Sequence, residues 1–196
     1  HTFLSDYVFS IDLLPFTDNE IIRMDQELVE YEQIFLNPDV EKNLMSKNEL
    51  MASFAISKAE NSTLTLQEAR DVYSVLLADK EYTFVTQKIT SKQKLTQKDY
   101  EKLEFFNIAQ TFRKLNQSTI TINDVSSSLI RDIHLNLTKG LDIFAESLSD
   151  FTVYKSGIWR DNNTIRVGTY IPAPFQGIDK GVRELVAWIK NNQSIA

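Results

Sequence analysis

Cysteine is absent from the 196 residues, and histidine, glycine and proline are scarce. Without cysteine this sequence has no disulfide, no thiolate zinc site, no iron–sulfur cluster and no cysteine nucleophile. The two histidines, His1 and His134, are too few for a multi-histidine metal site. Five glycines and four prolines are few for a β-sandwich or barrel, which needs many turns. We therefore expect a mainly helical protein.

Excess positive charge and long apolar runs are also lacking. The chain has 27 acidic and 21 basic residues, a formal net charge of −6, which opposes broad binding of nucleic acid through its phosphates. No run is long and apolar enough to span a membrane. No charged-then-apolar leader with a small-residue cleavage site is present. We expect a cytoplasmic protein with neither membrane nor nucleic acid as a partner.

Helix signals recur along most of the chain. Some stretches open with a capping box, in which a threonine precedes an acid by three residues. These pairs are Thr17 with Glu20, Thr65 with Glu68, and Thr96 with Asp99. Apolar residues then recur at three- and four-residue steps. The patterns predict helices over 17–36, 38–60, 65–78, 96–115, 178–191 and, with Asn123 as its cap, up to about residue 140.

Two segments depart from this pattern. Residues 88–98 hold four lysines and no acid, which predicts an exposed loop, with a phosphate-binding patch as the alternative. Residues 151–174 are rich in aromatic and β-branched side chains around Asp161-Asn162-Asn163, a sequence typical of a hairpin turn. We expect a single, mainly α domain over 1–196, with one small β-hairpin inside 158–171.

Few residues indicate chemistry directly. The five glycines stand singly, so the sequence has no glycine-rich loop to hold a phosphate. His134 follows an apolar stripe, which predicts a half-buried packing side chain, with a general base as the alternative. Residues 18–41 hold eight acids and one base, which indicates a solvated outer face.

Several stretches resemble a known family. Residues 57–69, SKAENSTLTLQEA, resemble the inhibitory segment of Fic-domain proteins, although Ser57 precedes Glu60 by three residues rather than the usual four. Residues 157–160, 165–168 and 170–174, which read GIWR, IRVG and YIPAP, resemble the family's hairpin, known as the flap. Residues 130–134 and 178–191 resemble helices that flank it. The resemblance covers about residues 45–192.

The resemblance implies a Fic-type protein adenylyltransferase, which transfers AMP from ATP to a hydroxyl group of a target protein with the help of magnesium. It implies a helical bundle with an N-terminal inhibitory region, 1–122, and the first part of the Fic domain, 123–196. The inhibitory residues would be Ser57, Glu60 and Asn61. The target-docking residues of the flap would be Ile165, Arg166, Val167 and Gly168.

The family's core motif, HPFxxGNGRxxR, occurs nowhere in the chain. The resemblance therefore implies a truncated form that is inactive alone, with no catalytic residue, no metal ligand and no cofactor of its own. A non-catalytic interaction or regulatory module is the alternative, and a helical DNA-associated regulator, which the net charge opposes, is a third. Without the core helix, apolar stripes would be left partly bare, so we expect self-association into a homo-oligomer, domain swapping, or a further tail of the chain. The stripes are Val125, Leu129, Ile133 and Leu137, and Val182, Leu185 and Ile189.

Overall fold

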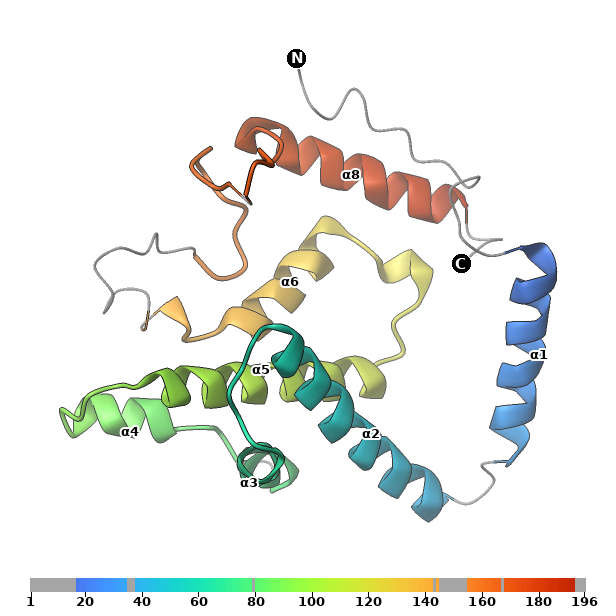
Figure 1. Ribbon diagram of the computed structural model, residues 1–196. Helices are drawn as coiled ribbons and strands as arrows, with labels where there is room; N and C mark the ends of the chain where they lie inside the picture. Colours follow the sequence, from blue (N-terminus) through green and yellow to red (C-terminus); the bar gives the residue numbers. More distant parts are fainter. Residues whose placement is uncertain are drawn as a thin grey trace.

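The computed structural model describes residues 17–34, 38–78, 80–142, 144, 155–166 and 168–192 (Figure 1). Its helices are α1 (Asp18–Ile34), α2 (Pro38–Ala59), α3 (Leu66–Leu77), α4 (Phe84–Thr90), α5 (Gln97–Gln117), the 3₁₀ helix η2 (Ile122–Asp124), α6 (Ser127–Thr138) and α8 (Phe175–Asn191). The prediction of a mainly α protein is confirmed. Among these described helices, none has the combined length and apolar character that a membrane span requires.

The three predicted capping boxes are formed. At the start of α3 the backbone N–H of Thr65 donates to Glu68 Oε2 at 2.8 Å, and the N–H of Glu68 donates to Thr65 Oγ1 at 3.2 Å. Equivalent reciprocal pairs open α1 and α5. Each box satisfies two backbone donors that have no partner within the helix. Local sequence therefore determines where these three helices begin.

α5 is the central helix of the bundle. It packs against α2, α3 and α6, and α6 in turn separates α5 from α8 (Figure 1). The main core cluster joins α3 to α5 and is closed by partly buried side chains of α2. Its buried members are Leu64, Ala69, Val72, Tyr73, Leu76, Phe105, Phe106 and Ala109. A smaller cluster of Val85, Leu103 and Phe144 holds α4 against α5.

α4 lies partly within the lysine-rich segment that was predicted to be an exposed loop. That prediction is wrong for Lys88, whose Nζ lies 2.8 and 2.9 Å from the two carboxylate oxygens of Asp99. It is also wrong for Lys98, which is half-buried and pairs with Glu68 at 2.9 Å. Lys92 and Lys94 are exposed in the turn that follows α4, as predicted.

α6 begins later than its predicted cap. Ser126, not Asn123, is the N-cap, because its Oγ accepts from the backbone N–H of Leu129 at 3.1 Å. The residues before it form η2, which opens with a further capping box between Thr121 and Asp124.

The described part of residues 155–174 contains turns and bends and no strand, so the predicted hairpin is not seen there. Tyr170 makes an isolated bridge. Asn162 Oδ1 accepts from both the N–H and the hydroxyl of Thr164, at 3.1 and 2.5 Å, and forms a local turn. The Arg160 guanidinium donates to the Asn162 carbonyl at 2.6 Å. Side chains therefore occupy backbone groups that a hairpin would pair.

Candidate functional site

The three predicted inhibitory residues lie at the end of α2. Asn61 has a φ of 62°, and its N–H donates to the Lys58 carbonyl at 3.0 Å. The N–H of Ser62 donates to the Ser57 carbonyl, also at 3.0 Å. This pair of bonds is a Schellman motif, in which asparagine accepts the left-handed conformation more readily than most residues. The motif ends the helix and leaves the Glu60 side chain exposed.

Ser57 is fully buried, and its hydroxyl has no hydrogen-bond partner among the described residues. It therefore does not support the Glu60 carboxylate, although the two residues lie near one another on the helix. Ser53, one turn earlier, is buried and unpartnered in the same way. These small side chains lie on the helix that packs most extensively against α5, where they permit a close approach of the two backbones.

Glu60 lies within electrostatic reach of α5. Burial raises the pKa of Glu104, and the charges of Glu60 and Glu101 raise it further against the opposing hydrogen bond from Tyr100. Burial also raises the pKa of Tyr100, as do the charges of Glu104 and Glu60. The end of α2 therefore presents its exposed carboxylate beside other carboxylates.

The predicted target-docking residues lie in a different part of the molecule, between α6 and α8. Ile165 is half-buried, Arg166 and Gly168 are exposed, and Val167 lies outside the described residues. Gly168 has a φ of 61°, and a Cβ placed there would meet no atom within 4 Å. Of these described docking residues, Ile165 lines a cavity, which contains none of the three inhibitory residues.

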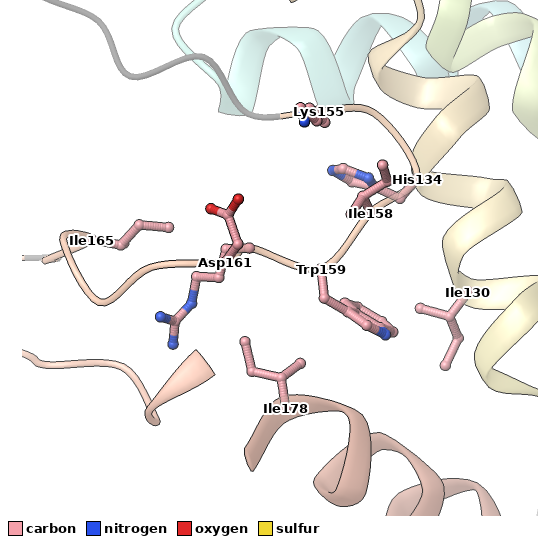
Figure 2. A pocket seen from close by; sticks show the side chains of 9 residues that line it. Ile130, His134, Lys155, Ile158, Trp159, Asp161, Ile165 and Ile178 are labelled. Atoms are coloured by element: carbon pink, nitrogen blue, oxygen red, sulfur yellow. The ribbon is translucent and has the colours of Figure 1, made fainter. Parts of the chain in front are cut away.

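A cleft of about 500 Å³ lies between α6, residues 155–165 and the start of α8 (Figure 2). Its volume is within the range of small-molecule sites. The lining residues are Ile130, His134, Lys155, Ile158, Trp159, Arg160, Asp161, Ile165 and Ile178. His134 and Ile165, which have separate sequence signals, both line this cleft.

Residues 156 and 157 form one wall of the cleft and are held to α6 by hydrogen bonds that they donate. The Gly157 N–H donates to His134 Nδ1 at 2.9 Å, and Ser156 Oγ donates to the Thr138 carbonyl at 3.0 Å. His134 is exposed, so the prediction of a half-buried packing histidine is wrong. Because Nδ1 accepts a hydrogen bond, the proton of the neutral ring lies on Nε2.

Long-range side-chain bonds hold the other wall to α8. Asn163 Oδ1 accepts from the Phe175 N–H at 2.8 Å and supplies the first turn of α8 with the cap that its own N-cap residue, Pro174, does not provide. The Arg160 guanidinium also donates to the Ala173 carbonyl, just before α8. No local sequence motif predicts these contacts, and the cleft was therefore not predicted from the sequence.

The described residues contain no group of three or more histidine, aspartate or glutamate side chains placed to hold a metal ion. Comparison with protein-family models, with curated proteins and with solved structures gives no match.

Proposed function

We propose that this chain is the regulatory and target-docking part of a Fic-type protein adenylyltransferase and that alone it transfers no AMP. The observation that carries the proposal is the exposed apolar surface of the segment that resembles the flap. Ile158, Tyr170 and Ile171 are 57%, 60% and 46% exposed. Exposed apolar side chains on a segment that forms no strand among the described residues suit the docking of an extended target segment.

Glu60 supports the regulatory half of this proposal. The Schellman motif fixes the end of α2, so the exposed carboxylate has a defined position rather than lying on a variable loop. The neighbouring Glu101 and Glu104 add negative potential there. An arginine from a catalytic segment would be attracted to this position and held away from the phosphates of ATP. ATP and magnesium are the cofactors proposed for the complete family member. Neither is proposed for this chain alone.

Labelled ATP tests the proposal. The purified 196-residue chain, incubated with magnesium and cell lysate, is expected to label nothing above background. In a protein that also carries the core motif, Glu60→Gln is expected to raise auto-AMPylation, while Glu30→Gln, which removes an exposed carboxylate on α1, leaves it unchanged. Clear labelling by the chain alone would contradict the proposal that it transfers no AMP. Equal auto-AMPylation rates for the two variants would contradict the regulatory role of Glu60.

A non-catalytic interaction module, including one that forms a homo-oligomer, is the second candidate. It is favoured by α6, which has no buried side chain along its whole length. Leu129, Ile133 and Leu137 on α6 are only half-buried, and so is the apolar stripe of α8. Translation of the gene past residue 196 discriminates between the candidates, since a His-Pro-Phe motif shortly afterwards favours the enzyme and its absence favours the module.

A further inference from the structure

We propose that the cleft between α6, residues 155–165 and α8 binds a small amphipathic carboxylate, an aryl or alkyl acid. This goes beyond the docking of a protein target, because the cleft has the volume and the mixed lining of a small-molecule site. The proposal rests on an apolar wall, an excess of positive charge and an oriented hydrogen-bond donor.

The apolar wall comes from α6, from the segment before α8 and from α8 itself. Figure 2 shows the Trp159 ring on the same side of the segment as Ile130 and Ile178, with its edge toward Ile130. Ile158 and Ile165 also line the cleft. A flat aromatic surface bordered by branched aliphatic side chains suits a ring or a short alkyl chain.

Positive charge exceeds negative charge in the cleft, although the whole chain carries −6. Lys155 is exposed, and no carboxylate among the described residues pairs with it. Arg160 donates only to neutral oxygens, those of Asn162, Asn163 and Ala173, so its charge is not compensated there. Asp161 is the single acid that lines the cleft. One further negative charge is therefore favoured, and a second would meet the Asp161 carboxylate.

His134 supplies a directed donor. Its Nδ1 accepts from the Gly157 N–H at 2.9 Å, which fixes the ring and places the proton of the neutral ring on Nε2. Figure 2 shows His134 and Lys155 near one another at one end of the cleft, with the Asp161 carboxylate turned to the same side of the segment. A carboxylate placed there would accept from the imidazole N–H and from the Lys155 ammonium, while its apolar part would lie against Ile158, which Figure 2 shows beside His134.

Three ligands of the same size and different charge test this inference: phenylacetate, 2-phenylethanol and phenethylamine. The chemical shifts of the Gly157 amide and the Trp159 indole N–H report binding in the full chain. Phenylacetate is expected to shift both signals saturably. 2-Phenylethanol is expected to bind about tenfold more weakly, the size of one charge-assisted hydrogen bond, and phenethylamine not to saturate.

Charge variants give effects of opposite sign that loss of structure would not produce. Lys155→Gln is expected to weaken phenylacetate about tenfold and leave 2-phenylethanol unchanged. Asp161→Asn removes the like charge and is expected to tighten phenylacetate. Lys94→Gln, an exposed lysine between α4 and α5, is the matched control and leaves both affinities unchanged.

Equal affinity for phenylacetate and 2-phenylethanol would overturn the preference for an anion. No saturable shift with any of the three ligands would overturn the site itself. Neither result bears on AMP transfer or target docking, which the labelling assay measures separately.

Discussion

Among single residues, Gly157 is the one whose geometry excludes other side chains most clearly. Its φ is 72°, and a Cβ would lie 2.9 Å from Leu135 Cβ and 3.3 Å from the Arg131 carbonyl oxygen. Gly157→Ala is therefore expected to lower the free energy of unfolding by about 2–4 kcal/mol, because backbone strain adds to overpacking against α6. Urea denaturation followed by circular dichroism measures the loss.

Gly168→Ala is the matched control. Gly168 has a similar φ of 61° but open space where the Cβ would go, so only the backbone cost of about 1–2 kcal/mol remains. Equal losses in the two variants would show that residue 157 does not approach α6 as closely as the structure has it.

Glu60 provides a second test at the residue scale, through its neighbour on α5. Burial is the main reason that the pKa of Glu104 lies above its usual range, and the Glu60 charge adds to it. Glu60→Gln is expected to lower the pKa of Glu104 without returning it to the ordinary value, because burial remains. Titration of the Glu104 side-chain carboxyl by nuclear magnetic resonance measures the change. An unchanged Glu104 pKa, as expected for the control Glu30→Gln, would contradict the placement of Glu60.

At the scale of elements, the start of α3 predicts a specific loss of stability in acid. The backbone N–H of Thr65 and the Lys98 ammonium hold the pKa of Glu68 at about 2, well below the ordinary glutamate value of 4.5. Because this pKa is depressed by folding, the stabilisation is present above about pH 4.5 and is lost as the pH falls toward 2. Glu68→Gln is expected to make the decline of Tm over this range shallower. Identical profiles of Tm against pH for the variant and the parent would contradict this contribution of Glu68 to stability.

The helices that the sequence predicted are those whose signals are local. Thr65 and Glu68 are three residues apart, so the box they form needs no knowledge of the rest of the fold. α4 was missed because seven residues are too few for a periodic pattern, and its position depends on burial of Val85 and on the ion pair between Lys88 and Asp99.

The cleft could not be read from the sequence for a related reason. The bond from Gly157 to His134 spans 23 residues and that from Phe175 to Asn163 spans 12, and both join a backbone group to a distant side chain. Alternating side chains around residue 165 predicted a hairpin, but the turn made by Asn162 and the carbonyl contacts of Arg160 compete with strand pairing in the described residues. Periodicity does not report such side-chain contacts.

At the scale of the whole molecule, the main feature is apolar surface that the described residues leave uncovered. On α1, which lies at the outside of the bundle in Figure 1, Ile22, Met24, Leu28 and Val29 are all more than half exposed. The seven stripe residues of α6, α8 and the segment before α6 are half-buried, as expected from the sequence. Met24 and Leu28, four residues apart, form an exposed apolar row on one side of α1, whereas Ile22 and Val29, seven residues apart, lie on roughly the opposite side. Single exposed apolar residues are ordinary in proteins, but a row of them on one helix is typical of an interaction surface.

Self-association at micromolar concentration is therefore expected. Light scattering should give a mass above 22.6 kDa that rises with protein concentration. Leu28→Gln is expected to shift association to several-fold higher concentration, since an exposed leucine buried at an interface contributes about 1.5–3 kcal/mol at most. Because this side chain is 57% exposed in the single chain, the substitution should leave the Tm of the dilute protein unchanged.

Gln26→Ala on the same helix is the control, because it removes an exposed polar side chain and leaves the apolar row intact. It should associate like the parent. The effect of salt then separates the two kinds of surface on α1: association through the apolar row persists at high salt, whereas association through its acidic residues would weaken as the charges are screened. A particle of 22.6 kDa at every concentration would contradict the expectation and imply that the exposed row on α1 serves a partner other than a second copy.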